Sequence, residues 1–323
     1  MITSYVSDGG RLAGQPGLGA TDARIVWIDL QNPDRDEEAQ VERRFGLDIP
    51  TREEMEEIEI SSRLYTEGGA LFMTAILPSH ADGDDPDMLP VSFVLANDTL
   101  ITVRYHDPRA FETFPARAAK VPMGCETGDS VLVALLEAVV DRLADILERD
   151  GREIDGISRT IFRKSGGKAM KSADLQDVIE AIGRKGDLTS NIRDSLVTLE
   201  RIAGFLGQQT LQKKSPRDLR ERIKTLSRDI RSLADHASYL SQKITFLLDA
   251  TLGMINIEQN AIIKIFSVAA VVFLPPTLIA SIYGMNFEHM PELEWLLGYP
   301  FAIGLMIVSA ILPFVYFKRR GWL

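Results

Sequence analysis

The most regular pattern in the chain is a stripe of apolar residues that alternates spacings of four and three over four heptads. A seven-residue repeat of this kind is typical of helices that pack as a left-handed coiled coil. The stripe could bind a second copy of the chain, or it could pack against other helices of the same chain. Its members are Leu219, Ile223, Leu226, Ile230, Leu233, Ala237, Leu240, Ile244 and Leu247.

The helix that carries this stripe is predicted to continue into an apolar segment. Between Arg217 and Leu274 there is no proline and only one glycine, Gly253. Residues 265–282 form about 18 uncharged positions and residues 296–317 about 22, and roughly 20 apolar residues suffice to cross a bilayer. The sequence therefore predicts a stalk helix that becomes the first of two membrane spans.

The charges around the two spans predict their orientation. The connecting residues 283–295 contain three glutamates and no Lys or Arg, whereas Lys318, Arg319 and Arg320 follow the second span. The positive-inside rule places such a basic tail in the cytoplasm and the acidic loop outside. The first residues lack the apolar run of a signal peptide, which predicts the same orientation, with both termini in the cytoplasm.

The residues before the stalk alternate between strand-like and helical patterns. Strands are predicted at 24–30, 70–77, 91–96 and 100–105, and a charged helix at 33–45. Helical periodicity begins near residue 129 and resumes from about 173 to 206. We thus expect an α/β part at 1–128, a helical part at 129–212, a stalk and first span at 213–282 with its membrane part at about 262–282, a loop at 283–295, a second span at 296–317 and a tail at 318–323.

Charge and composition narrow the class of function. Residues 1–212 hold 23 basic and 37 acidic residues, a net charge of −14 against −10 for the whole chain, which argues against a nucleic-acid partner. This acidity suits a domain that meets cations, or it is a solvated surface. The chain has one cysteine and four scattered histidines, a pattern that gives no catalytic cofactor site. Gly14, Gly17 and Gly19 lie in a loop that does not join a strand to a helix, so they do not form a phosphate-binding loop. We expect no enzyme.

One face of the first span has the pattern of a pore lining. Thr277 and Ser281 lie four residues apart, hence on one side of a helix, and spacings of three and four extend that side toward the stalk. This side is polar at its ends and apolar in the middle, as expected for a water-filled pore with a hydrophobic gate. The alternative is a plain membrane anchor, in which Ser and Thr bond to backbone carbonyls of their own helix. A single hairpin encloses no pore, so a pore requires an oligomer. The face comprises Asn260, Ile263, Phe266, Ala270, Leu274, Thr277 and Ser281.

The outer end of the first span carries the most specific motif. The sequence YGMNF at 283–287 is followed by Glu288 and by MPEL at 290–293. This combination resembles the CorA family of divalent-cation channels. INIEQN at 255–260, IIKIFSV at 262–268, FLPPTLIAS at 273–281 and YFKRRGWL at 316–323 are similar to its magnesium-transporting branch. The resemblance is dense over 247–323 and fainter upstream.

The resemblance implies a bacterial inner-membrane homopentamer. Each subunit would have an α+β cytoplasmic domain with α/β/α layers that forms a funnel, a long stalk helix and two C-terminal transmembrane helices. It would admit Mg²⁺, and also Co²⁺ and Ni²⁺, passively, because 100 mV inside negative favours entry of a divalent ion by roughly 4.6 kcal/mol. The resemblance assigns Gly284, Met285 and Asn286 to a selectivity filter, Leu274 to a constriction and Asp249 to an inner acidic ring.

The chemistry of magnesium explains such a filter. Mg²⁺ gives up its water reluctantly, so a ring of neutral Asn286 carboxamides can select the hydrated ion without holding it too tightly. Glu288 and Glu292 would raise the cation concentration outside, or they belong to a solvated loop. In the family, intracellular magnesium is thought to close the channel by bridging acidic residues of neighbouring subunits. Asp229 and Asp235 are candidates for this regulatory metal, with plain surface charge as the alternative.

Two other functions remain open at this stage. One is a zinc transporter like the ZntB branch of the same superfamily, against which the MPEL loop argues. His289 departs from the aromatic residue common there in the magnesium branch, and it would suit a softer cation or be an exposed loop residue. The other is a membrane-tethered signalling or scaffold protein, which should tolerate Asn286→Ala.

Overall fold

The computed structural model describes residues 1–19, 24–83, 86–163, 172–213, 215–286, 290–291 and 295–322. The chain divides into two compact units. The first comprises Met1–Gly166 and Gln176–Leu248, and the second comprises Gly167–Leu175 and Asp249–Leu323.

The first unit contains a seven-stranded sheet with the order β2-β1-β3-β7-β6-β5-β4. Strands β3 and β7 are parallel, with Trp27 opposite Leu100, and all other neighbours are antiparallel. The strands are β1 (Ile2–Asp8), β2 (Arg11–Pro16), β3 (Ile25–Gln31), β4 (Leu64–Glu67), β5 (Ala70–Ser79), β6 (Asp87–Ala96) and β7 (Thr99–Arg104).

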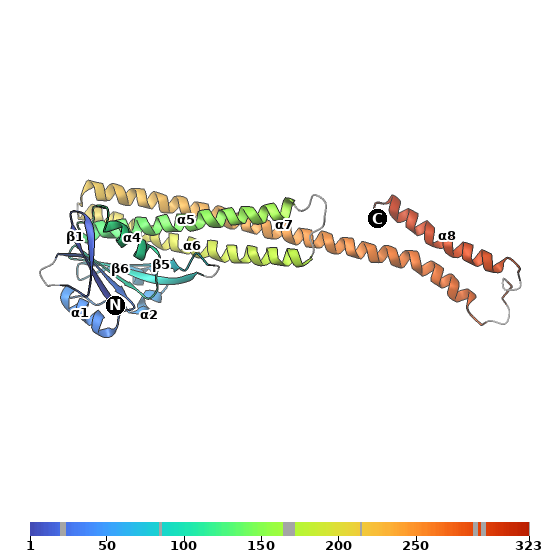
Figure 1. Ribbon diagram of the computed structural model, residues 1–323, viewed down its shortest axis with the longest axis horizontal. Helices are drawn as coiled ribbons and strands as arrows, with labels where there is room; N and C mark the ends of the chain where they lie inside the picture. The colour runs from blue at the N-terminus through green and yellow to red at the C-terminus, as the bar shows by residue number, and fades with distance from the viewer. Residues whose placement is uncertain are drawn as a thin grey trace. The chain divides into compact units, whose positions relative to one another are not determined.

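Helices cover both faces of this sheet, which explains why β3 and β7 are almost entirely apolar or buried. On one face lie α1 (Arg35–Phe45) and α2 (Arg52–Glu56), and Val41 and Met55 join the buried cluster there. The short α3 (Ile60–Arg63) leads directly into β4. On the other face α4 (Ala110–Ala118) packs Phe111 and Phe114 near the Trp27 ring, at 6.2 and 5.8 Å between centroids. Figure 1 shows the long helices on this second side, which gives the expected α/β/α layers.

Three long helices form the rest of the first unit: α5 (Gly128–Arg163), α6 (Ser172–Gln212) and the first part of α7 (Arg217–Tyr283). The heptad stripe of α7 faces α5 and α6, and eight of its nine residues are buried, with Leu233 half-buried. The stripe contacts both neighbouring helices: a Cβ on Gly151 of α5 would lie 3.6 Å from Leu240, and one on Gly186 of α6 would lie 3.7 Å from Ile244, both ordinary van der Waals distances. The stripe therefore packs within the chain and is not a free surface for a second copy.

The second unit contains the rest of α7 together with α8 (Gly298–Arg319). Helix α7 stays continuous through Pro275 and Pro276. Among the described residues two helices, α7 and α8, are long and apolar enough to cross a membrane by length and composition, and only 6% of each apolar window is buried inside the chain. These windows correspond to the two spans predicted from the sequence.

The structure differs from the sequence prediction at the start of the chain. Strands β1 and β2 occupy a region where Gly14 was expected in a loop, and Gly14 instead pairs with Tyr5. A Cβ on Gly14 would lie 2.9 Å from the Tyr5 ring, which itself stacks on Trp27 at 4.2 Å. Gly14 is thus required because the Tyr5 ring packs against its Cα, and not because the chain turns there. Helix α4, with Pro115 inside it, was also missed.

Candidate ion-conducting segment

The predicted pore face lies on the continuous part of α7 and is exposed along its whole length. Asn260 and Ser281 are separated by about 30 Å of helix, similar to the thickness of a bilayer core. Ile263 is 60% exposed, Phe266 72% and Leu274 64%, and the other four positions of the face are exposed as well. Most of the rest of the apolar part of α7 is exposed in the same way, so the pore lining stays a prediction from the sequence pattern.

Thr277 is held by its own helix. Its hydroxyl donates to the carbonyl oxygens of Leu274 at 2.8 Å and of Phe273 at 3.0 Å. This is the backbone bonding that a plain membrane anchor would also show. It has a chemical consequence, however, because a hydroxyl whose hydrogen is engaged presents only acceptor lone pairs. Water bound to a cation points its hydrogens outward, so this oxygen is suited to accept from a hydrated ion.

The helix ends where the filter motif begins. The Gly284 N–H donates to the carbonyl oxygen of Ala280 at 3.0 Å, and the Met285 N–H donates to Ile282 at 3.3 Å. A Cβ on Gly284 would lie 3.1 Å from the Ala280 oxygen, so only glycine fits here without a local shift. Asn286 follows directly and is exposed. This close turn places Asn286 at the end of the pore face.

The acidic residue predicted for the inner end lies on the same side of the helix. Asp249 precedes Asn260 by eleven residues, close to three turns of 3.6 residues, and both side chains are exposed. Asp249 and the seven pore positions thus share one side of α7. Three residues of the outer loop, Glu288, His289 and Glu292, lie outside the described residues.

The two regulatory candidates are exposed on the stalk. Asp229 and Asp235 both lie on the surface of α7. The described residues contain no group of three or more His, Cys, Asp or Glu side chains that could hold a metal. A cation at either aspartate would therefore need ligands beyond the described part of a single chain.

An acidic group near Asp229 was missed by the sequence analysis. Burial, followed by the carboxylates of Asp145 and Glu137, raises the pKa of Asp141, and Asp229 adds to this effect. Three of these residues lie on α5, and their proximity to α7 depends on helix packing. Only the order of acidic residues along α5 could have indicated them.

Comparisons with known proteins show the family of the chain and its fold. A family model described as CorA-like Mg²⁺ transporter protein matches residues 22–319. The magnesium transport protein CorA of Escherichia coli (strain K12) is 37% identical over 298 residues, which cover 92% of each chain. The protein of the same name from Salmonella typhimurium gives the same values. The complete CorA magnesium transporter structure from Methanocaldococcus jannaschii shares the fold with a TM-score of 0.80 at 19% identity, covering 100% of this chain and 99% of that one.

Proposed function

Because the chain belongs to the family of CorA-like Mg²⁺ transporter proteins, we propose that it is a passive uptake channel for divalent cations. Its main substrate is Mg²⁺, with Co²⁺ and Ni²⁺ also admitted, and the membrane potential drives entry. The observation that carries the proposal is the exposed face of α7, which runs from Asn260 to Ser281 and ends at Gly284-Met285-Asn286. Its relatives named as magnesium transport proteins support the choice of ion.

The channel selects the ion in its hydrated form. Asn286 supplies a neutral carboxamide oxygen at the mouth, and Thr277 supplies an acceptor oxygen about 14 Å further along the helix. Both accept hydrogen bonds from the water shell that Mg²⁺ retains. Between the polar ends, Leu274, Ala270 and Phe266 form the apolar constriction, and Asp249 attracts cations at the inner end.

One face cannot enclose a pore, so the channel is an oligomer, and the family resemblance favours a homopentamer. In this arrangement the membrane part of α7 at about 262–282 lines the pore, and α8 lies outside it toward lipid. The loop at 283–295 faces the periplasm, where Glu288 and Glu292 attract cations. The tail at 318–323 and the domain at 1–212 lie in the cytoplasm of a bacterial cell, and the spans cross its inner membrane.

Regulation by intracellular Mg²⁺ is part of the proposal. The metal would bind between neighbouring subunits, where Asp229 or Asp235 of the stalk meets acidic residues of another copy. The channel needs no catalytic cofactor and carries out no enzymatic reaction. Its open state is controlled by occupation of these sites.

The proposal is tested by cation flux into proteoliposomes that hold the full chain. Mg²⁺, Co²⁺, Ni²⁺ and Zn²⁺ are offered separately under an imposed inside-negative potential. We expect Mg²⁺ uptake that Asn286→Ala abolishes or makes unselective, whereas Gln208→Ala, which removes an exposed amide from α6, leaves it unchanged.

Three outcomes contradict the proposal. Absence of flux for every ion excludes a channel, and flux that survives Asn286→Ala with its selectivity intact excludes the filter. Zinc flux that follows an imposed proton gradient instead favours a ZntB-like transporter.

A further inference from the structure

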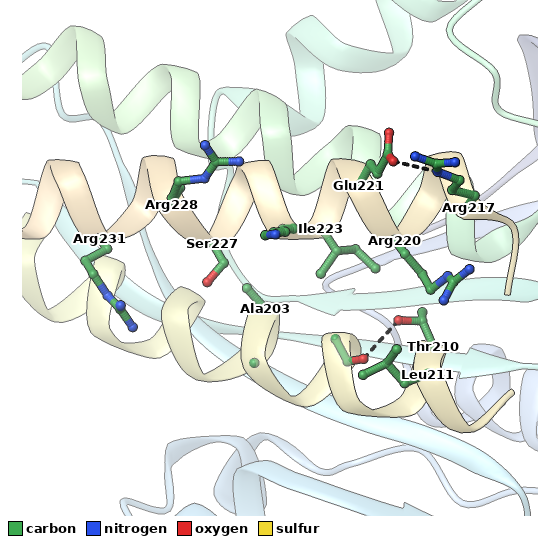
Figure 2. Close-up of a pocket in the computed structure, with 13 residues that line it drawn as sticks. Ala203, Thr210, Leu211, Arg217, Arg220, Glu221, Ile223, Ser227, Arg228 and Arg231 are labelled. Carbon is green, nitrogen blue, oxygen red and sulfur yellow. Dashed lines mark hydrogen bonds and ion pairs between the residues drawn. The ribbon is translucent and has the colours of Figure 1, made fainter. Parts of the chain in front are cut away.

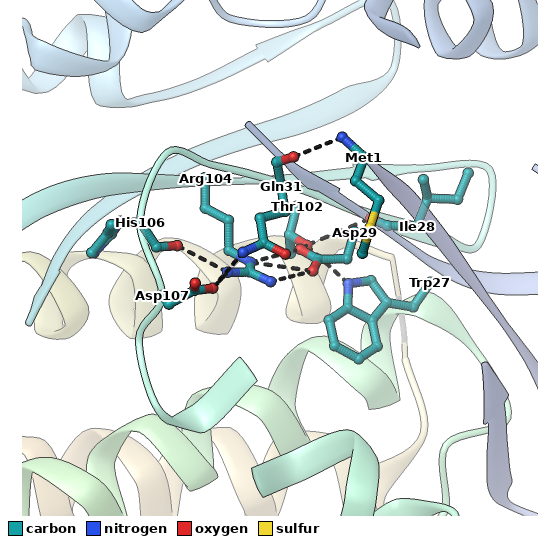
Figure 3. Close-up of polar contacts among 9 residues, drawn as sticks. All are labelled: Met1, Trp27, Ile28, Asp29, Gln31, Thr102, Arg104, His106 and Asp107. Atoms are coloured by element: carbon teal, nitrogen blue, oxygen red, sulfur yellow. Dashed lines mark hydrogen bonds and ion pairs between the residues drawn. The ribbon is translucent and has the colours of Figure 1, made fainter. Parts of the chain in front are cut away.

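The first unit has a groove between α6 and α7 whose rim is strongly basic (Figure 2). Its volume is about 670 Å³, within the range of ligand and docking sites. The floor of the groove is formed by small apolar residues of α6, including Gly204. A Cβ added to Gly204 would have no atom within 4 Å, so the space above this residue is open. We call this feature the basic groove. Its rim consists of Arg217, Arg220, Lys224, Arg228 and Arg231.

Part of this charge has no partner within the chain. Arg217 pairs with Glu221 at 2.8 Å and Arg231 pairs with Glu200 at 2.9 Å. For the remaining rim cations the described part of the chain provides neither an ion pair nor a hydrogen bond. These three, spaced four residues apart and hence aligned over about 12 Å of helix, are Arg220, Lys224 and Arg228.

A segment of opposite charge lies elsewhere in the same unit. Residues 52–59, which we call the acidic segment, comprise α2 and the three residues after it and contain five glutamates and one arginine. Glu54 caps the helix at Thr51, and Glu56 pairs with Arg52 at 3.2 Å. Within the described residues the carboxylates of the other three, Glu53, Glu57 and Glu59, make no ion pair.

The acidic segment also carries an unusual apolar residue. Ile58 lies between two glutamates and is 85% exposed, which is unusual for a large apolar side chain. At the basic groove Leu211 is 64% exposed and lies on α6 about two turns beyond Gly204. Each surface thus combines three unpaired charges with an uncovered apolar side chain, and the signs of the charges are opposite.

The two surfaces lie apart within one chain. Met55 anchors α2 in the cluster on one face of the sheet, whereas α6 reaches the edge of β5, where Thr198 accepts from the Ile76 N–H at 3.2 Å. Figure 1 shows α1 and α2 on the side of the sheet away from α5, α6 and α7. Complementary patches on opposite sides of a subunit produce head-to-tail contacts, which close into a ring when the rotation permits.

We propose that the acidic segment of each copy docks in the basic groove of the next copy around a ring. Ile58 packs over Gly204 and Leu211, and Glu53, Glu57 and Glu59 face Arg220, Lys224 and Arg228. The inference rests on the oligomer of the proposed function and names the surfaces that assemble its cytoplasmic part. Charges that meet across such a contact fix the partner and its register more than they add affinity.

Disulfide cross-linking of the full chain in membranes tests the contact. The variant Ile58→Cys/Gly204→Cys should form a ladder of dimers, trimers and larger species under mild oxidation, because each copy joins two neighbours. The native Cys125 is buried and does not contribute. The matched control Ile58→Cys/Arg193→Cys places the second cysteine on α6 about 16 Å from the groove and should give at least tenfold less product. A product limited to dimers, or equal yields from both variants, overturns the head-to-tail docking.

Charge reversal provides a second test that does not depend on added cysteines. Arg220→Glu/Lys224→Glu and Glu57→Lys/Glu59→Lys should each raise the apparent dissociation constant of the purified oligomer about tenfold. The four substitutions together should restore it, because every contact then regains opposite charges. All these side chains are exposed, so circular dichroism should show unchanged folding. Failure of the combined variant to recover assembly contradicts the proposal.

The two proposals fail separately. If the ladder is absent while Mg²⁺ flux persists, the docking contact is wrong and the channel stands. If the ladder forms while no cation enters the vesicles, the contact stands and the channel does not.

Discussion

Thr277 donates its hydroxyl hydrogen to the carbonyl oxygen of Leu274 at 2.8 Å, one turn back along the same helix. The residue that faces the predicted pore is thereby fixed as an acceptor. We predict that Thr277→Val, which keeps the shape and loses the oxygen, lowers Mg²⁺ flux by up to about tenfold, since one hydrogen bond contributes about 1 kcal/mol. Thr277→Ser should retain most of the flux. Equal flux for the Val and Ser variants in proteoliposomes would show that the oxygen does not meet the ion.

Gly284 is predicted to be irreplaceable for conduction and unimportant for folding. A Cβ at this position would lie 3.1 Å from the Ala280 oxygen, so Gly284→Ala must move the turn that leads to Asn286. We expect at least a tenfold loss of Mg²⁺ flux with an unchanged melting temperature, because misplacement of a binding group by about 1 Å has effects of this size. The control is Gly253→Ala, for which no atom lies within 4 Å of the added Cβ. Normal flux in Gly284→Ala would remove this residue from the filter.

Asp82 connects three arginines of the first unit. Arg109 and Arg142 lie 2.6 Å from its carboxylate and Arg149 lies 2.8 Å away. Hydrogen bonds from Arg142 and Arg149 lower the pKa of Asp82 to about 2. Because the pKa is lower in the folded state, the stabilisation is complete above the unfolded value near 4 and is lost as the pH falls toward 2.

We therefore predict that Asp82→Asn destabilises the protein by about 1 kcal/mol at pH 7, a value kept small by solvent screening of this exposed cluster. The measurement is the difference in melting temperature between the full-length variant and the wild type. That difference should shrink between pH 4 and pH 2. A difference that is constant over this range contradicts the assignment.

Asp150 should respond in the opposite direction. Its carboxylate is buried, accepts from the Thr189 hydroxyl at 2.7 Å and lies 3.6 Å from the Lys185 amine. Burial raises its pKa. The folded state thus opposes ionisation of Asp150, and this cost appears as the pH rises above the unfolded value near 4.

We predict that Asp150→Asn raises the melting temperature at pH 7, because the neutral amide avoids the desolvation cost of the buried carboxylate. Lys185 keeps Glu153 as a second ion-pair partner, so the substitution does not leave a buried cation alone. The gain should vanish as the pH falls below about 4, where Asp150 becomes neutral in both states. Destabilisation at pH 7 would mean that the Lys185 pair outweighs the cost of burial.

The sequence predicted the long helices and the central strands well because their apolar periods are local properties. It could not decide what covers the heptad stripe, since the period identifies an apolar face without naming its partner. The burial of the stripe in the folded bundle, with Leu240 near Gly151 and Ile244 near Gly186, settles this point. Strand β2 was missed because Gly14 resembles a loop residue until the Tyr5 ring is placed beside it.

The placement of the candidate pore residues on one side of α7 was predictable for a different reason. From Asn260 to Ser281 they lie on one helix, so spacing alone brings them to one side, whereas the roles of Asp249 and Asn286 came from the resemblance to the family. The basic groove was not predictable, because Gly204 and Lys224 belong to two helices that become neighbours only after folding. Ile58 likewise gave no signal in the sequence, where a single apolar residue among glutamates usually indicates the buried side of a helix.

The burial of the heptad stripe within one chain also determines the order of events during biogenesis. A newly made copy needs no partner to cover Ile230 or Leu240, so its helical bundle forms by a unimolecular reaction whose rate is independent of protein concentration. If copies assemble through the contact proposed above, they meet only after this step, and the extent of assembly depends on concentration and salt. Dilution of the protein should therefore leave the first unit of each chain fully folded and should not yield unfolded chains.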